Sequence, residues 1–418
     1  MRILYSVMIH AYGFTIRLAA LFNEKAALWV RGRRRIFERI GTALQESRDQ
    51  RGQRKLAWFH CASLGEFEQG RPLIEKFRNQ YPDYQVLLTF FSPSGYEYRK
   101  AYPGADFIFY LPLDTPSNAR KFIDLVRPDL VFFIKYEFWF NYLAILQRRG
   151  IPHFLVSAIF RADQHFFQWY GNWPRKILSG FTQIFVQNNG SKELLGFIGI
   201  TNVSVAGDTR FDRVAEIAST TRDIPMISLF TEDMPVLVAG STWPADEALL
   251  VRYLKERTGK MKLILVPHEI RENAIRGLLN ELGPTAQRYS ALSLESAQGG
   301  KVLIIDSVGM LSQLYRYGTI AYVGGGFGAG IHNVLEAAVY GMPVIFGPNY
   351  INFHEAVELV AHHGGYPVDQ YKDLEKILDL FLMNPSRLTE ASVASKEFVN
   401  SRTGATSAIL QEISGDIH

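Results

Sequence analysis

Residues 319–336 combine an apolar run, a glycine cluster and two polar side chains in an order that suits a phosphate ligand. The apolar run at residues 319–323 predicts a buried strand, and the apolar spacing after the glycines predicts a helix. Glycines let a ligand approach the backbone closely, and the free N–H groups that begin a helix attract a phosphate. Five glycines lie between the two elements: Gly324, Gly325, Gly326, Gly328 and Gly330.

Asn333 and Glu336 extend this hypothesis from a phosphate to a nucleotide. Their separation by three positions places both side chains on one side of the first helical turn. A carboxylate accepts hydrogen bonds from a sugar diol, so Glu336 would lie at a ribose. The alternative is a tight turn in which Asn333 caps the helix and Glu336 is its partner. Both interpretations stay open.

Residues 324–329 also satisfy the relaxed dinucleotide fingerprint G-x-G-x-x-A, which is a weak signal alone. The loop lies far down the chain, and Asn349 stands where an acid should follow at about 20 residues. A nicotinamide cofactor is therefore disfavoured.

Two acids follow predicted strands in the first half of the chain. Glu66 ends the stretch HCASLGE just before a helix, and Glu137 lies in YEFW after another strand. A carboxylate at such an edge can take a proton from a hydroxyl, whereas the alternative is an acid that favours a helix start. Cys61 adjoins His60, but neighbours in a strand point to opposite faces, so we discount a thiol nucleophile.

The second half offers hydroxyl and cationic groups after two further strands. Ser241 and Thr242 supply hydroxyls, although helix capping explains them equally well. His268 and Arg271 follow the next strand, and Arg271 can pair with a phosphate or carboxylate. His, Asp and Glu residues show no metal-ligand spacing, so we expect no metal.

Short apolar strands alternate with helical patterns in two blocks, which predicts an α/β protein with two doubly wound, Rossmann-like domains facing across a cleft. Alternation is lost near residues 210–233 and then resumes. We expect an N-terminal segment at 1–45, one domain at 46–212, a linker at 213–233, a second domain at 234–395 and a helical tail at 396–418 that can pack back on the first domain. The expected strands are residues 56–59, 85–90, 107–110, 130–134, 153–156, 184–186, 236–239, 263–266, 302–305, 319–323 and 344–346.

The basic excess of the chain is confined to its beginning. Residues 1–56 carry 12 Lys and Arg against 4 Asp and Glu, although the whole chain has a net charge of only +4. Residues 3–16 lack formal charge and, at 14 residues, are shorter than the roughly 20 that span a bilayer. We expect a helix in the cytoplasmic leaflet, with anionic head groups bound by Arg31, Arg33, Arg34 and Arg35.

A cleaved signal peptide and a nucleic-acid-binding arm are the alternatives for this segment. The single cysteine excludes internal disulfides and favours a reducing compartment, which speaks against a signal peptide. We expect no nucleic-acid partner.

Seven motifs together resemble bacterial 3-deoxy-D-manno-octulosonic acid (Kdo) transferases, and the resemblance covers nearly the whole chain. The motifs are HCASLGE (60–66), YEFW (136–139), GDTRFD (207–212), AGSTWPADE (239–247), VPHEIRE (266–272), GGGFGAGIHNVLEAA (324–338) and FGPNYINF (346–353). The resemblance implies a GT-B fold, inversion at the anomeric carbon, no metal, and transfer from CMP-Kdo to a lipid A precursor at the cytoplasmic face of the inner membrane.

The resemblance also implies residue roles. Glu66 would be the general base on the acceptor hydroxyl and Glu137 a second active-site acid, while Arg210 stands where the family often has lysine. The loop 268–271 and the glycine loop would hold the cytidine phosphate, so the donor-binding residues would be Ser241, Thr242, His268, Arg271, Gly325, Gly326, Gly328, Asn333 and Glu336.

This chain departs from the family pattern at Trp243, where histidine is frequent, at residues 269–271, where the family loop is more basic, and at Asp208, a usual asparagine. A nucleotide-sugar epimerase and a non-catalytic, nucleotide-binding peripheral membrane protein are the alternative functions. The sequence leaves open the number of Kdo residues added, the oligomeric state, and whether the N-terminal segment spans the membrane or lies flat.

Overall fold

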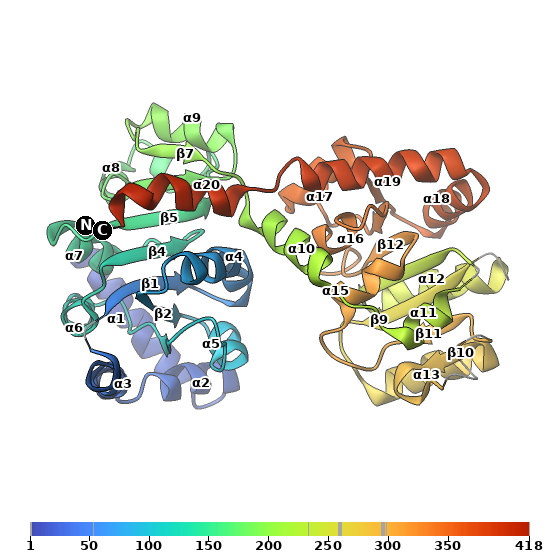
Figure 1. Cartoon of the computed structure of the whole chain (residues 1–418), viewed down its shortest axis with the longest axis horizontal. Helices are drawn as coiled ribbons and strands as arrows, with labels where there is room; N and C mark the ends of the chain where they lie inside the picture. Colours follow the sequence, from blue (N-terminus) through green and yellow to red (C-terminus); the bar gives the residue numbers. More distant parts are fainter. Residues whose placement is uncertain are drawn as a thin grey trace. The chain divides into compact units, whose positions relative to one another are not determined.

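The computed structural model describes residues 2–52, 54–232, 234–257, 261–293, 297 and 299–417. Residue 233, the end of the predicted linker, and the terminal residues 1 and 418 lie outside this set. The chain forms two compact units, one of residues 1–213 with 404–418 and one of residues 214–403. In the described residues each unit contains a seven-stranded sheet, and every strand pairing in both sheets is parallel (Figure 1).

The first sheet has the strand order β3-β2-β1-β4-β5-β6-β7, so the chain winds outward from β1 in both directions. Its strands are β1 (Lys55–Cys61), β2 (Tyr84–Phe90), β3 (Phe107–Tyr110), β4 (Leu130–Ile134), β5 (His153–Ala158), β6 (Gln183–Val186) and β7 (Val203–Val205). The helices of this unit are α1 (Arg2–Ala19), α2 (Glu24–Gly32), α3 (Ile36–Arg51), α4 (Leu64–Gln80), α5 (Pro93–Arg99), α6 (Pro116–Val126), α7 (Phe140–Arg148), α8 (Asn172–Leu178), α9 (Asn189–Phe197) and α20 (Ala405–Glu412).

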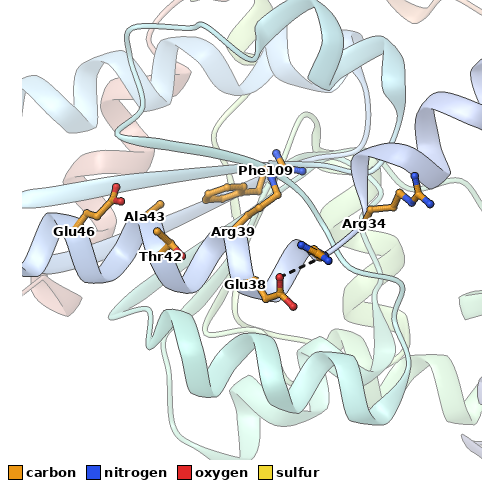
Figure 2. Close-up of a pocket in the computed structure, with 8 residues that line it drawn as sticks. Arg34, Glu38, Arg39, Thr42, Ala43, Glu46 and Phe109 are labelled. Carbon is orange, nitrogen blue, oxygen red and sulfur yellow. Dashed lines mark ion pairs between the residues drawn. The ribbon is translucent and has the colours of Figure 1, made fainter.

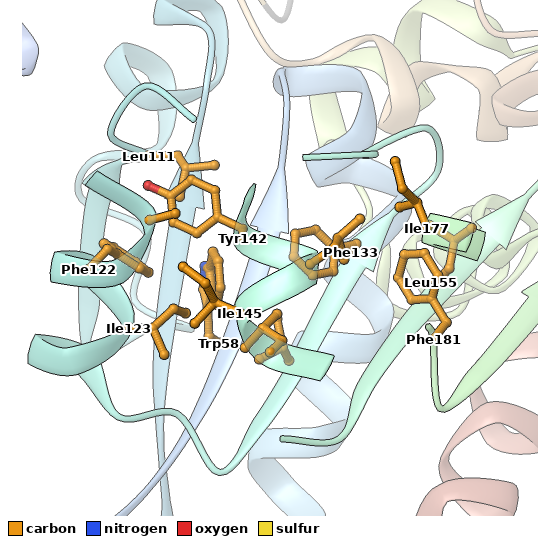
Figure 3. Packing of buried hydrophobic residues seen from close by; sticks show 14 of the residues in the cluster. Trp58, Leu111, Phe122, Ile123, Phe133, Tyr142, Ile145, Leu155, Ile177 and Phe181 are labelled. Atoms are coloured by element: carbon orange, nitrogen blue, oxygen red, sulfur yellow. The ribbon is translucent and has the colours of Figure 1, made fainter. Parts of the chain in front are cut away.

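The central strands are continuous apolar runs because helices cover both faces of the sheet. On one face Trp58 of β1 packs against Phe122 of α6, with ring centroids 4.9 Å apart, and against Tyr142 of α7 at 5.7 Å (Figure 3). On the other face Phe59 stacks on Phe132 of β4 at 4.5 Å. Alternation along one strand therefore supplies two separate cores.

The second sheet has the order β10-β11-β9-β8-β12-β13-β14. Its strands are β8 (Val236–Thr242), β9 (Lys262–Pro267), β10 (Ala286–Arg288), β11 (Val302–Ile304), β12 (Ile320–Val323), β13 (Val344–Phe346) and β14 (Gly365–Pro367). Its helices are α11 (Pro225–Thr231), α12 (Pro244–Glu256), α13 (Glu272–Leu282), α15 (Leu311–Leu314), α16 (Leu335–Ala338), α17 (His354–Ala361), α18 (Tyr371–Met383) and α19 (Pro385–Asn400), and α10 (Thr209–Thr220) crosses from one unit to the other.

Two doubly wound sheets confirm the predicted fold class, and every expected strand is present. Three strands were not predicted: β7, β10 and β14. Each of these strands has three residues and lies at the edge of its sheet, where an apolar run is not required. The helix predicted after the glycines is present only as the single turn α16, so it is shorter than expected.

The two ends of the described chain pack onto the first unit. Helix α1 is fixed to it by Tyr5, whose hydroxyl donates to Asp114 at 2.7 Å. Helix α20 returns to pack on α4, and the carboxylate of Asp212 accepts hydrogen bonds from the N–H groups of Gly404 and Thr406 at its start. None of the helices in the described ranges has the length and apolar character needed to cross a bilayer.

Candidate active site

Parallel strands end at a common edge, and this edge gathers the predicted acids of the first unit. Strand β1 pairs with β4, with His60 opposite Phe133. Glu66 follows β1 in the first turn of α4, and Glu137 follows β4. Burial, first, and then the charges of Glu66 and Glu137 raise the pKa of the buried Cys61 thiol. The two acids therefore lie around one strand end, and Cys61 is unsuited to be a nucleophile.

Glu66 is held at the start of α4 by a capping box. Its carboxylate accepts a hydrogen bond from the N–H of Ser63 at 3.1 Å and another from the Ser63 hydroxyl. The helix-start alternative is thus realised in the geometry. The side chain stays partly exposed, so its carboxylate remains reachable from solvent.

Glu137 is buried and lies in a polar network inside the apolar core. Its Oε2 is 3.1 Å from Nε2 of His60 and accepts a hydrogen bond from Nε1 of Trp139. The other ring nitrogen of His60, Nδ1, lies 2.9 Å from the hydroxyl of Thr89. Sequence reasoning missed His60 and Trp139 as partners of Glu137, although a histidine within a buried apolar strand signals a need for polar partners.

Arg210 pairs with the buried carboxylate of Asp208, which its Nε contacts at 2.9 Å. Gln69 of α4 donates to the same carboxylate at 2.8 Å. Burial opposes the ionisation of Asp208, but the charge of Arg210 and these hydrogen bonds outweigh it and lower the pKa. The departure from asparagine at this position therefore supplies an anion that orients Arg210.

Tyr136 locates Arg210 and Glu66 at the same edge. Burial raises the pKa of the Tyr136 hydroxyl, Arg161 and Arg210 act to lower it, and Asp208 and Glu66 act to raise it. Because such charge effects weaken with distance, Arg210 and Glu66 both lie in the neighbourhood of the Tyr136 hydroxyl. The structure thus brings three predicted catalytic residues, Glu66, Glu137 and Arg210, to one edge of the sheet.

Non-glycine residues with left-handed backbones mark the carboxyl ends of three strands. Lys135 follows β4 with a φ of 71°, Ser157 lies in β5 with 53°, and Ser241 lies in β8 with 54°. Such conformations cost on the order of 1 kcal/mol each and cluster at functional sites. Their positions identify the carboxyl edge of each sheet as its candidate site.

In the second unit the glycine loop is packed tightly between other backbone segments. A Cβ on Gly326 would lie 2.6 Å from the backbone of Gly347, and one on Gly324 would lie 2.3 Å from the carbonyl of Ser241. Gly325 and Gly330 have positive φ angles of 92° and 139°. Most of these glycines are therefore required by close packing and backbone angle, whereas a Cβ on Gly328 would meet nothing nearer than 3.6 Å.

Asp246, which sequence reasoning missed, fixes this loop. Its buried carboxylate accepts hydrogen bonds from the N–H of Gly325 at 3.0 Å and from the hydroxyl of Tyr322 at 2.7 Å. The N–H groups of Gly328 and Gly330 bond to the carbonyl of Gly325. Each of these three amides therefore already has a hydrogen-bond partner, Asp246 for Gly325 and the loop itself for Gly328 and Gly330.

Asn333 and Glu336 pair with each other as the capping alternative expects, although the N-cap position of α16 is Val334 and not Asn333. The Asn333 amide donates to Glu336 at 3.0 Å, and its oxygen accepts from the N–H of Leu335 at 3.1 Å. Because α16 is a single turn, it supplies only a small dipole for an anion. Glu336 also lies close enough to Tyr315 and Tyr340 to influence the pKa of both hydroxyls, which burial mainly raises.

Three rings stack beside the glycine loop. The centroids of Trp243 and His268 are 4.8 Å apart, and those of His268 and His332 are 4.4 Å apart. Burial and the neighbouring His268 lower the pKa of His332, which favours its neutral form. Such a stack offers apolar faces and ring nitrogens to a ligand, and it includes His268 among the predicted donor residues.

The remaining predicted donor residues differ in accessibility. Thr242 is buried and donates to Glu247 at 3.0 Å, so its hydroxyl acts within the fold. Arg271 is 71% exposed and pairs with Glu269. Ser241 is partly exposed at the end of β8. Sequence reasoning missed Glu247 as the acceptor of the hydrogen bond from the Thr242 hydroxyl.

The N-terminal arginines divide into one internal and three surface residues. The guanidinium of Arg33 donates to the carbonyls of Leu111 at 2.9 Å and Phe91 at 2.8 Å and lies 3.7 Å from the ring centroid of Trp29. The Arg33 guanidinium is thus occupied by contacts within the protein, and its predicted role as a head-group contact stays a prediction. The exposed residues are Arg31, Arg34 and Arg35.

No group of three or more His, Cys, Asp or Glu side chains within the described ranges could hold a metal ion.

A protein family described as 3-deoxy-D-manno-octulosonic-acid transferase (kdotransferase) matches residues 34–213. A 3-deoxy-D-manno-octulosonic acid transferase of Haemophilus influenzae is 29% identical over 366 residues, covering 84% of this chain and 85% of the relative. A protein of the same description from Aquifex aeolicus is 29% identical over 326 residues, covering 76% of this chain and 83% of the relative.

Solved structures share the two-sheet architecture. A UDP-GlcNAc 2-epimerase of Neisseria meningitidis superposes with a TM-score of 0.60 at 16% identity, covering 87% of this chain and all (100%) of the other. MurG of Acinetobacter baumannii superposes with a TM-score of 0.54 at 13% identity, covering 86% of this chain and 99% of the other. At these identities the likeness establishes the GT-B-like fold alone.

Proposed function

We propose that this chain, a relative of the 3-deoxy-D-manno-octulosonic acid transferases, is a glycosyltransferase that moves Kdo from CMP-Kdo to a lipid A precursor in lipopolysaccharide biosynthesis. The observation that carries the proposal is sequence similarity along 84% of this chain to a protein described as a 3-deoxy-D-manno-octulosonic acid transferase. The arrangement of Glu66, Glu137 and Arg210 at one sheet edge supports it, because those positions carry the motifs of the family.

On the acceptor side, Glu66 is the proposed general base. Its partly exposed carboxylate stands at the carboxyl edge of the first sheet, where ligands of open α/β sheets bind. Ser63 holds it through two hydrogen bonds, which fixes its direction. Glu137 and Arg210 add one buried and one paired charge that can orient sugar hydroxyls and carboxylates.

On the donor side, the glycine loop and the three stacked rings are the proposed CMP site. The ring faces of Trp243 and His268 suit a planar group, and the exposed Arg271 suits a phosphate. Because a nucleotide monophosphate is a good leaving group, the proposed reaction needs a base on the acceptor hydroxyl but no metal. The hydroxyl displaces CMP in one step, which inverts the anomeric carbon.

Product analysis with purified protein tests this proposal. The chain is incubated with CMP-Kdo, with and without a lipid A precursor, and the masses of the lipid products are measured by mass spectrometry. A transferase releases CMP and increases the mass of the lipid by one or more Kdo residues. The size of the increase gives the number of Kdo residues added. Release of no CMP with the lipid present would contradict the proposal.

A nucleotide-sugar epimerase is the second candidate, because a UDP-GlcNAc 2-epimerase shares the fold. It predicts conversion of the nucleotide sugar without any lipid. The same incubation with UDP-GlcNAc alone separates the two functions, since a transferase leaves that compound unchanged.

Helix α1 supports a place at the cytoplasmic face of the inner membrane. Its inner side packs on the first unit through Tyr5, whereas the outer side is apolar and exposed, with Ile3 82% and Phe14 61% accessible. Such a face can enter the head-group region while the exposed arginines bind anionic lipids. The exposed apolar residues are Ile3, Leu4, Val7, Met8, Phe14 and Leu18.

Sedimentation with vesicles of inner-membrane phospholipids tests this placement. Phe14→Glu should reduce the bound fraction several-fold, because a charge on the inserted face opposes burial. Phe197→Glu is the matched control, since Phe197 is 85% exposed on α9, a helix that packs beside β6 and β7. Equal binding of the two variants would contradict docking through α1.

A further inference from the structure

A cavity of about 670 Å³ lies where α1, the turn between α2 and α3, and the start of α6 meet. We call it the α1–α6 pocket. Helix α1 contributes Arg17, the turn contributes Arg34 and Arg35, and α6 contributes Ser117 and Lys121. A neighbouring hollow of about 900 Å³, shown in Figure 2, shares Arg34 and Arg35 with it. Glu38 lines both hollows as well, and cationic side chains outnumber acidic ones in each.

The acid that lines this pocket, Glu38, pairs with only one of its cations, Arg35. The Arg34 guanidinium has no hydrogen-bond or ion-pair partner in the described residues, and Figure 2 shows it apart from the Glu38 pair. Arg35 reaches Glu38 only at 3.8 Å, and both side chains are mostly exposed, so their attraction is weak. Lys121 lies 4.6 Å from the ring of Phe37. Repulsion between these cations disfavours an empty pocket.

The backbone that carries the cations is held rigidly. Arg33, at the base, is fixed by three backbone carbonyls and the ring of Trp29. Arg35 has a left-handed backbone with a φ of 49°, a conformation that costs on the order of 1 kcal/mol outside glycine. An arginine at a strained position next to other arginines indicates a use for its side chain.

Helix α6 adds neutral donors to the opposite wall. Thr115 caps the helix by accepting from the N–H of Asn118 at 3.2 Å, and the first turn contains no acid. Ser117 is exposed at the mouth of the pocket and presents its hydroxyl there. Guanidinium groups facing a hydroxyl form the donor set that tetrahedral phosphate oxygens accept from.

We propose that the α1–α6 pocket binds a phosphate monoester on a membrane lipid. The pocket adjoins the exposed apolar side of α1, so a helix lying in the head-group layer would bring lipid phosphates to Arg17 and Arg34. A monoester carries more charge and more acceptor oxygens than a diester, which matches several convergent donors. The inference rests on the membrane docking proposed above and adds head-group selection to it.

Vesicle binding at matched surface charge tests the selection. Full-length protein is titrated with phosphatidylcholine vesicles that contain either phosphatidic acid, a monoester, or phosphatidylserine, a diester, at equal zeta potential. We expect wild type to bind the phosphatidic acid vesicles on the order of tenfold more tightly, as one or two charge-assisted hydrogen bonds provide. Equal affinities would overturn the proposal.

Two double variants with the same loss of charge locate the effect. Arg34→Gln with Lys121→Gln removes two pocket cations. It should reduce the ratio of the affinities for phosphatidic acid and phosphatidylserine vesicles to near one. Lys25→Gln with Arg31→Gln removes two exposed cations outside the pocket and should weaken binding to both vesicles equally. Loss of the preference in both double variants would assign it to general charge and overturn the proposal.

Glycerol 3-phosphate distinguishes a lipid ligand from a soluble one. Calorimetry with glycerol 3-phosphate should show weak binding that Arg34→Gln with Lys121→Gln abolishes. If wild type binds no vesicle, the proposed membrane docking is wrong. Binding of glycerol 3-phosphate by wild type and its loss in the double variant Arg34→Gln with Lys121→Gln would still support a phosphate site in the pocket. No glycerol 3-phosphate binding together with no vesicle preference would overturn it.

Discussion

The carboxylate of Glu137 lies 3.1 Å from Nε2 of His60, and both side chains are buried in the first unit. His60 is the one polar side chain among the buried residues of its strand, so its ring needs polar partners there. Its Nδ1 contacts Thr89 while its Nε2 contacts Glu137, which fixes the ring between a neighbouring strand and the candidate active site. The pair therefore determines the direction in which Glu137 points.

Replacement of His60 should destabilise the protein and misplace Glu137. His60→Leu leaves a buried carboxylate with the indole of Trp139 as its remaining partner, at a cost of about 3 kcal/mol in the free energy of unfolding. Urea unfolding of His60→Leu, Glu137→Gln and the double variant measures the coupling between the two side chains. Additive losses would show that the two residues do not interact.

Glu66→Gln should fold normally and lose transfer. Glutamine also serves at the third position of a capping box, so the bond from the Ser63 N–H remains. Removal of a general base typically lowers kcat by 10²–10⁴-fold, roughly the range we expect. CMP release and donor binding are measured in parallel, with Glu193→Gln on the exposed side of α9 as the control. Near-normal turnover would remove Glu66 from the mechanism.

The fold and part of the candidate site follow from local sequence patterns. Buried parallel strands must be continuous apolar runs, so β1 and β4 are visible in the sequence, and both acids follow them directly. Ligands of such sheets bind at the carboxyl edge, so the sequence alone makes Glu66 and Glu137 candidates. Edge strands such as β7 have only three residues, which is too short for a strand pattern to be recognised in the sequence.

Contacts between distant segments were not predictable in the same way. Arg33 belongs to a run of arginines that reads as surface charge, yet carbonyls of Leu111 and Phe91 enclose it. Asp246 reads as an ordinary residue of a helix start, yet it binds the N–H of Gly325 far along the chain. Such pairings depend on tertiary packing, which a linear pattern does not encode.

Asp114 should make stability depend on pH in a defined window. Burial raises the pKa of this carboxyl from 3.8 to about 6, although hydrogen bonds from Tyr5 and from the N–H groups of Asn141 and Tyr142 oppose the rise. The folded protein therefore binds a proton more tightly than the unfolded chain. Its contribution to stability is present at low pH and is lost as pH rises from about 4 to about 6.

Urea unfolding of wild type and Asp114→Asn between pH 4 and 7 measures this contribution. The free energy of unfolding of wild type minus that of the variant should increase by up to about 3 kcal/mol as pH falls through the window. Subtraction removes the titration of groups common to both proteins. A difference that is independent of pH would show that Asp114 does not titrate with folding.

The packing of the glycine loop distinguishes two of its glycines. A Cβ at Gly326 would lie 2.6 Å from the backbone of Gly347, which cannot rotate away, whereas a Cβ at Gly328 would meet its nearest atom at 3.6 Å. Gly326→Ala should therefore displace the loop and cost about 1–3 kcal/mol in the free energy of unfolding. Gly328→Ala should leave stability nearly unchanged.

Thermal unfolding of the two alanine variants, together with calorimetry using CMP-Kdo, measures both effects. If the loop forms the donor site, Gly326→Ala weakens donor binding at least tenfold, because the stacked rings beside the loop lose their support. Gly328→Ala is the control for the stability measurement, since it adds a methyl group without a backbone clash. Equal stability of the variants would refute the close packing, and unchanged donor affinity in a destabilised Gly326→Ala would place CMP elsewhere.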